Sequence, residues 1–161
     1  MNAIKMLKQQ HREVDKLFKQ LAATKTAEPR LKTFIQIADA LAIHATIEER
    51  HFYPSVKEKQ TEDILLESVE EHLEIKRVIA DLLQMDADDE EFVAKVTVLQ
   101  EDVQHHVEEE EGELFPMVER LFDDEALETL GATMQETQDE LLRKGNPRNA
   151  IPDEIGAAAP L

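Results

Sequence analysis

Two copies of one motif place a histidine four residues before a glutamate. The segment from residue 44 to 54 reads HATIEERHFYP and aligns without gaps with the segment from 106 to 116, which reads HVEEEEGELFP. The shared pattern is H-x-x-x-E-E-x-x-x-aromatic-P. Because residues i and i+4 lie on the same face of an α-helix, each copy can present an imidazole and a carboxylate to one metal ion. The proline that ends each copy predicts a bend or an end of the helix just beyond the pair.

Six ionisable residues interrupt apolar stripes that otherwise follow helical 3/4 spacing. They are His11, His44, Glu48, His72, His106 and Glu110. Leaving that many polar groups buried without partners would cost several kcal/mol each. At ~1.5 Å per residue, all six are expected roughly 15–22 Å from the same end of a helical bundle. The sequence therefore predicts that these four histidines and two glutamates converge on a buried metal site.

The apolar spacing predicts the elements that hold these residues. Strand-like alternation is absent, and short polar breaks separate five helical segments. Short loops between long amphipathic helices make neighbours antiparallel, so we predict an all-α, up-down-up-down four-helix bundle with a short fifth helix at its C-terminal end. Residues 1–143 are expected to form one domain. Residues 144–161 contain three prolines and no periodicity, and we expect them to form a mobile tail.

The helical prediction includes two details, the buried positions of the fourth segment and the cap of the third helix. In the fourth helical segment the buried stripe continues, on unbroken 3/4 spacing, through Leu114, Met117 and Leu121. Thr61 or a near neighbour is expected to cap the start of the third helix.

Composition excludes several classes of function. The 161 residues include 18 Lys+Arg and 36 Asp+Glu, which gives a net charge of −18. This charge disfavours non-specific binding to nucleic acid. The absence of cysteine excludes thiolate metal sites and disulfides. No apolar run exceeds four residues, so neither a membrane span nor a signal peptide is expected. We expect a cytoplasmic protein.

The ligand types narrow the choice of metal. Six nitrogen and oxygen ligands without sulfur suit iron, manganese or zinc rather than copper(I) or an iron–sulfur cluster. Six side chains distribute naturally over two ions if both glutamates bridge and two histidines bind each ion. Such a centre would keep a positive charge that an oxo or hydroxo bridge lowers. Its open positions would admit O₂ or peroxide.

Residues near the predicted ligands allow one additional role, for His51, and argue against two other kinds of metal site. His51 lies one turn beyond Glu48 and could support the site from outside, whereas His105 lies about 100° off the stripe and is not expected to bind metal. A ferritin-like di-iron site needs Glu-x-x-His on two helices. Only Glu48-x-x-His51 fits, and Asp102-x-x-His105 fits loosely. A zinc-protease helix is not supported, because no His-Glu-x-x-His occurs.

The motifs resemble those of the hemerythrin family, in particular its bacterial HHE cation-binding branch. The resemblance covers about residues 1–143 and includes His-Arg-Glu-Val-Asp around His11 and Glu-Glu-His-Leu-Glu-Ile around His72. It implies a non-haem di-iron centre in a four-helix bundle, held by the six residues above, with manganese or zinc less expected. Respiratory hemerythrins carry a further histidine where this chain has Lys76. They also have an aspartate five residues after the last histidine, whereas this chain has a glutamate four residues after it. These departures speak against reversible O₂ carriage.

Two functions follow as expectations. The first is a di-iron protein that binds or reacts with O₂ or hydrogen peroxide, decomposing peroxide or protecting against oxidants. The alternative is a protein that senses or stores O₂, nitric oxide or iron without turnover. A purely structural metal clip ranks last, because four packed helices do not need one. The expected partners are small molecules, with no nucleic acid or membrane.

Overall fold

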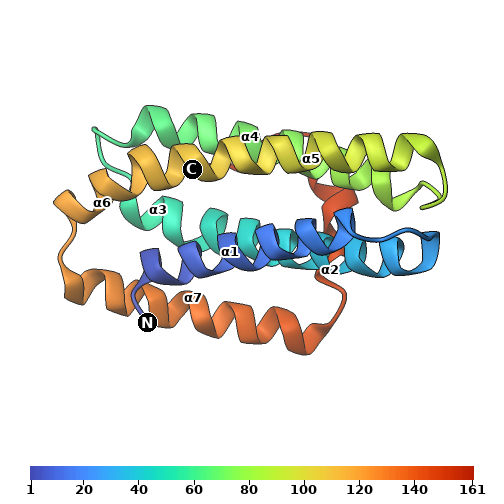
Figure 1. Cartoon of the computed structure of the whole chain (residues 1–161). Helices are drawn as coiled ribbons and strands as arrows, with labels where there is room; N and C mark the ends of the chain where they lie inside the picture. The colour runs from blue at the N-terminus through green and yellow to red at the C-terminus, as the bar shows by residue number, and fades with distance from the viewer.

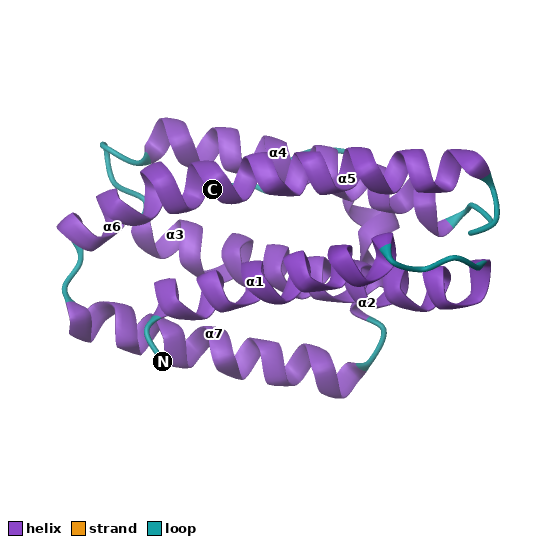
Figure 2. Cartoon of the chain, in the orientation of Figure 1, coloured by secondary structure: helices purple, strands orange, loops and turns teal.

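The chain folds into a bundle of helices without strands, as Figures 1 and 2 show for all 161 residues of the computed structural model. Four long helices enclose the core of the bundle: α1 (Ala3–Ala22), α2 (Ala27–Ile47), α4 (Glu62–Leu83) and α5 (Glu90–Glu109). This architecture confirms the predicted all-α helical bundle. None of its helices combines the length and apolarity needed to cross a membrane.

Two of the long helices continue through a π-helical turn into a short α-helix. The turn η1 (Glu48–Phe52) joins α2 to α3 (Tyr53–Val56), and the turn η2 (Glu110–Leu114) joins α5 to α6 (Phe115–Leu121). The chain then forms α7 (Asp124–Lys144) and the 3₁₀-helix η3 (Pro147–Glu154).

Short polar side chains fix the starts of three helices. The Asn2 side chain accepts a hydrogen bond from the Ile4 amide at 2.8 Å, and Asp89 and Asp123 cap α5 and α7 in the same way. Thr61 occupies the expected position before α4, but its hydroxyl donates to the Val56 carbonyl at 2.8 Å instead of capping the helix. Thr61 therefore fastens the α3–α4 loop.

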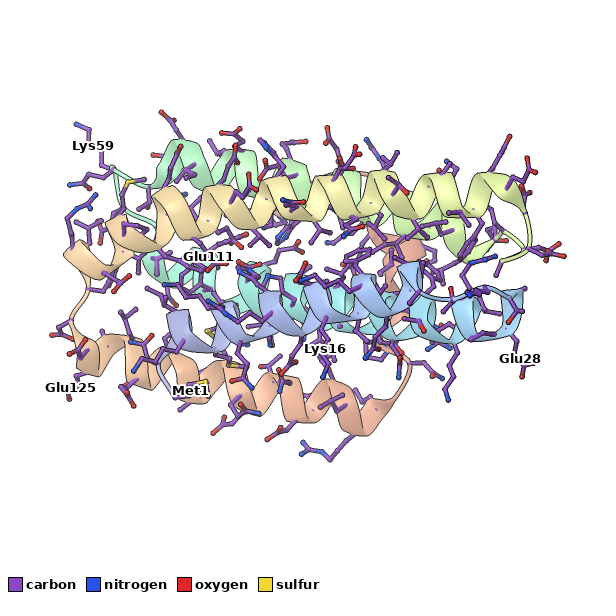
Figure 3. The ribbon with its side chains drawn as sticks, in the orientation of Figure 1. Met1, Lys16, Glu28, Lys59, Glu111 and Glu125 are labelled. Carbon is purple, nitrogen blue, oxygen red and sulfur yellow. The ribbon has the colours of Figure 1, made fainter.

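The hydrophobic core has two parts, with the polar layer between them. One part includes Leu7, Ile47 and Phe115, and the other includes Phe18 and Phe34. Along α1 the first part uses residues before His11 and the second uses residues after it. The predicted ligands thus lie between two closely packed apolar clusters. Charged residues such as Lys16 and Glu28 project outward (Figure 3).

The π turns explain why unbroken 3/4 counting fails in the fourth helical segment. The structure buries Leu114, Phe115 and Val118 completely, whereas Met117 is half-buried and Leu121 is 40% exposed. The predicted stripe through Met117 and Leu121 is therefore wrong. A π turn contains one residue more than an α turn, so the residues after it are shifted by one position.

Each π turn also accommodates the proline that follows it. The amides of Tyr53 and Phe115 bond the carbonyls of Glu48 and Glu110, five residues earlier. The next residue in each case is a proline, which has no amide hydrogen and would clash with a carbonyl four residues before it in a regular helix. The prolines are thus part of helices that continue, rather than helix ends.

The fifth helix is not short. With 21 residues, α7 equals α2 in length, and it packs against α1 and α2 on the outside of the bundle (Figure 1). The N-terminus approaches α7 so closely at Gly131 that an added Cβ would lie 2.0 Å from the Met1 carbonyl oxygen. Only glycine fits at this position without a shift of the backbone.

The C-terminal residues are packed rather than free of the bundle. The segment η3 lies against α2 and α4, where Figure 1 shows it crossing in red behind the bundle. Ile151 is 2% exposed and belongs to one of the two core clusters. The Arg148 guanidinium contacts the Asp39 carboxylate at 3.0 Å. This packing differs from the expected mobile tail, because tertiary contacts hold a segment that lacks periodicity.

Candidate metal centre

All six predicted residues converge in one buried layer of the bundle. The Glu110 Oε1 atom lies 3.2 Å from His11 Nε2 and 3.3 Å from His106 Nε2, and His72 Nε2 lies 3.1 Å from His106 Nε2. Each of the six side chains is buried, and both glutamates are completely so. They come from all four long helices and the two π turns: His11, His44, Glu48, His72, His106 and Glu110.

The layer divides into two groups of three potential ligands. One group combines His11 and His44 with Glu110, and the other combines His72 and His106 with Glu48. Within each group the ligand atoms lie within 4.8 Å of one another. Each group has the two imidazoles and one carboxylate that suit a divalent transition metal.

Each glutamate also reaches across to the other group. Glu110 contacts His106 at 3.3 Å, and Glu48 Oε1 lies 2.5 Å from His44 Nε2 and 3.4 Å from His72 Nε2. The two carboxylates thus lie between the two pairs of histidines. This is the placement that a pair of bridging ligands requires.

Every histidine of the layer points Nε2 inward and bonds an acceptor through Nδ1. The four Nδ1 contacts are His44 to Gln10 at 2.7 Å, His72 to Glu49 at 2.7 Å, His106 to Glu71 at 2.8 Å and His11 to Glu111 at 3.1 Å. Ionised carboxylates and the amide oxygen of Gln10 accept hydrogen bonds but do not donate them. Nδ1 therefore carries the proton, and a neutral imidazole keeps its Nε2 lone pair free. This arrangement is typical of metal-binding histidines.

These outer acceptors follow a regular order around the bundle. Each one is adjacent in sequence to a predicted ligand of its own helix and bonds a histidine of the next helix. Gln10 on α1 bonds the histidine of α2, and Glu49 bonds that of α4. Glu71 bonds the histidine of α5, and Glu111 bonds that of α1, which completes the circle. In Figure 3, Glu111 lies between the ribbon of α5 and α6 and the ribbon of α1. This outer ring of acceptors fixes the orientation of all four imidazoles.

Three buried atoms of the layer lack hydrogen-bond partners. They are His44 Nε2 and both carboxylate oxygens of Glu48. Other polar atoms of the layer lie close to these three atoms, but the angles between them do not allow hydrogen bonds. An unsatisfied buried polar atom costs about 1–3 kcal/mol, and more if charged. Metal coordination would satisfy all three, so the residues fit a bound ion.

The electrostatics of the layer couple its acids and bases. Burial lowers the pKa of His106, but the adjacent carboxylates of Glu110, Glu48 and Glu71 outweigh burial and hold it well above its usual value. The pKa of Glu48 is well below normal, because the electrostatic attraction of the nearby His44 outweighs the effect of complete burial. Without metal, protons on the histidines therefore supply the positive charge beside the glutamates that metal ions would otherwise supply.

Tyr53 is a member of the site that sequence reasoning missed. Its hydroxyl donates to Glu110 Oε2 at 2.9 Å and lies 3.2 Å from His72 Nε2 and 3.4 Å from His106 Nε2. Burial, together with the negative charges of Glu110 and Glu48, raises its pKa well above 10, so the phenol stays protonated. The sequence pattern drew attention only to the proline after Tyr53, because the π turn that rotates Tyr53 inward leaves no mark in the periodicity.

The outer acceptors were also missed, although a local signal existed. Three of them are glutamates that stand beside Glu48, His72 and Glu110 in the sequence. An acidic neighbour of a buried ligand can reach over the helix surface to the adjacent helix. Charge alone does not reveal this role, because most of the chain's 36 acidic residues are on its surface.

The two remaining histidines lie outside the layer. His51 Nε2 bonds the Thr137 hydroxyl on α7 at 2.7 Å, so His51 does not take the outer-support role considered for it. His105 is 63% exposed and contacts Glu109 and Glu71, and Glu71 also accepts from His106 Nδ1. The position of His105 agrees with the prediction that it lies off the buried stripe.

Comparisons with known proteins identify a family and a relative that this chain resembles. The family model described as Hemerythrin HHE cation binding domain matches residues 2–118. A DNA nickase of Nostoc sp. is 30% identical over 118 residues, which are 73% of this chain and 34% of that protein. The chain thus spans about a third of the length of this relative.

A solved structure extends the comparison to the fold. The crystal structure of a hemerythrin HHE cation binding domain-containing protein from Mycobacterium kansasii superposes with a TM-score of 0.80. The match covers 89% of each chain at 21% sequence identity. It shows a common fold.

Proposed function

The chain belongs to the hemerythrin HHE cation-binding family, and we propose that it is a non-haem di-iron protein that binds or reacts with O₂ or hydrogen peroxide. The observation that supports this most strongly is the buried layer itself. Four inward Nε2 atoms and two carboxylates come together there, with three atoms that have no hydrogen-bond partner.

In this proposal the six residues divide between two iron ions. His11 and His44 would hold one ion and His72 and His106 the other, with the carboxylates of Glu48 and Glu110 available to both. Six side chains would not complete the coordination of two ions, so small molecules could bind as further ligands. When bound, the pair supplies the capacity to exchange electrons with O₂ or peroxide. Manganese or zinc would fit the same donors, but the redox role requires iron or manganese.

The protein's own residues would control protons and access. The Tyr53 hydroxyl lies within 3.4 Å of both His72 Nε2 and His106 Nε2 and donates its one proton to Glu110, so it would hold that carboxylate in place beside this histidine pair. Glu49 and Glu71 keep the Nδ1 protons of His72 and His106 in place. Apolar clusters on both sides of the layer exclude bulk water.

A role in sensing or storage, without turnover, uses the same geometry and is the alternative. DNA nicking is not proposed for this chain. The net charge of −18 opposes binding to phosphates, and about two-thirds of the Nostoc protein lies outside the match.

Peroxide consumption separates the two functions. Protein loaded anaerobically with iron(II) is mixed with hydrogen peroxide, and peroxide loss and O₂ release are followed together. The controls are Glu48→Ala, which lacks one carboxylate of the layer, and His105→Ala, which removes an exposed histidine that is not a predicted ligand. Catalytic loss in the wild type and His105→Ala, but not in Glu48→Ala, supports the reactive function. A spectral change without turnover supports sensing or storage, and loss no faster than with free iron refutes the enzyme.

A further inference from the structure

A small, mostly apolar cavity adjoins the buried layer of predicted ligands. Its volume is about 40 Å³, and ten of its 19 lining residues are hydrophobic. All four histidines of the layer contribute to its wall, together with apolar residues such as Ile75, Val103 and Ile151. A space of this size holds only a few molecules as small as water. The lining favours small uncharged molecules over ions.

The C-terminal segment forms one wall of this cavity. Pro147, Ala150, Ile151 and Glu154 of η3 all line it. Because η3 lies against both α2 and α4, it covers the groove between two helices that carry the histidines of different pairs. The buried Ile151 side chain holds the segment in the core.

Ionic contacts fasten this segment at both ends. Near its start, Arg148 binds Asp39 of α2 through its guanidinium at 3.0 Å, and its amide donates to the same carboxylate at 3.0 Å. Near its end, the Glu154 carboxylate contacts the Lys76 ammonium of α4 at 3.0 Å. Just beyond η3, the Ile155 carbonyl accepts a hydrogen bond from Arg77 at 3.1 Å.

The contact at the end of the segment connects directly to the metal layer. Lys76 is buried, and its ammonium also donates to Glu49 at 2.8 Å, the carboxylate that accepts from His72 Nδ1. The chain of contacts from His72 through Glu49 and Lys76 to Glu154 thus joins a predicted ligand to the C-terminal segment.

We propose that residues 147–155 form a strap that opens to admit small uncharged molecules to the cavity beside the histidines and closes through the Arg148–Asp39 and Glu154–Lys76 pairs. We call these residues the C-terminal strap. Its role as a gate to a metal pair rests on the proposed function. The access that it controls is a property of the protein without metal and can be tested separately.

Tyr53 provides a direct probe of access, because it is the chain's one tyrosine and there is no tryptophan. It is buried and lies 3.2 Å from His72 Nε2, a residue of the cavity wall. The experiment measures quenching of Tyr53 fluorescence in the full-length, metal-free protein by dissolved O₂ and by iodide. Hydrogen exchange of the non-proline backbone amides within residues 147–156 reports opening of the strap in the same samples.

The test variant is Arg148→Ala/Glu154→Ala, which removes both closing pairs. The control is Glu140→Ala/Lys144→Ala, which removes an exposed ion pair on α7. Loss of two partly exposed pairs is expected to raise the open population roughly 2- to 30-fold. The O₂ quenching constant should rise by a similar factor in the test variant, with little quenching by iodide, and stay at the wild-type value in the control.

A second variant ends the chain at Asn146 and removes the strap entirely, with helix content checked by circular dichroism. If it stays folded, its O₂ quenching should exceed that of the point variant. Faster exchange of amides 147–156 with unchanged O₂ quenching would overturn the proposal, as would equal quenching in the test and control variants. Should the shortened chain unfold, the point variants alone decide. Failure to bind iron would refute the proposed function but leave the quenching result unaffected.

Discussion

Replacing Glu71 with leucine tests whether the outer ring of acceptors prepares the histidines for metal. Glu71 accepts the Nδ1 proton of His106 at 2.8 Å, and leucine has a similar size but no acceptor. Loss of such an outer partner costs about 10- to 100-fold in metal affinity, or ~1.4–2.8 kcal/mol. The loss should fall on the ion held by His72 and His106, because the other histidine pair keeps its own acceptors.

The assay is an anaerobic iron(II) titration against a coloured chelator of known affinity, which resolves two binding steps. Glu70→Leu is the matched control, since Glu70 is the exposed neighbour of Glu71 on the same helix. An internal check comes from Glu109, whose pKa is raised to about 7 by burial and by the adjacent Glu71. That pKa should fall in Glu71→Leu. Equal iron affinities in the two leucine variants would refute the role of the ring.

Three further predictions follow from the same geometry. Glu48→Ala should empty both metal positions and His11→Ala should weaken chiefly one, whereas His105→Ala should retain wild-type metal content by elemental analysis. Removal of metal should lower the melting temperature, because the ion binds the folded layer and not the unfolded chain. The pKa values of His72 and His106 are raised in the metal-free fold, where neighbouring carboxylates outweigh burial. This stabilisation is complete below pH ~6.5 and is lost as pH rises through the raised values. Metal binds neutral imidazoles, so calorimetry should show that metal raises the melting temperature more at pH 8 than at pH 6.

The sequence was sufficient to predict the bundle and the residues that converge inside it. Helical periodicity is strong in four segments, and a polar residue on an apolar stripe is conspicuous. His11 and His72 could be aligned in depth with the two His/Glu pairs, because each helix rises by a constant amount per residue.

The remaining features depend on departures from regular helices or on tertiary contacts. A π turn adds a residue without changing the composition, so Val118 rather than Met117 is buried and Tyr53 turns into the site. The C-terminal strap has little helical pattern, and its position depends on one buried isoleucine, Ile151, and on ionic contacts with α2 and α4. No local rule in the sequence predicts such contacts.

The most direct test of the central claim is anomalous X-ray diffraction at the iron edge, from crystals loaded with iron(II) without oxygen. Two peaks should appear in the buried layer, one beside His11 and His44 and one beside His72 and His106, with the Glu48 carboxylate reaching both. A single peak in the layer would contradict a metal pair. Iron found only at the surface cluster around His105 would contradict the buried centre itself.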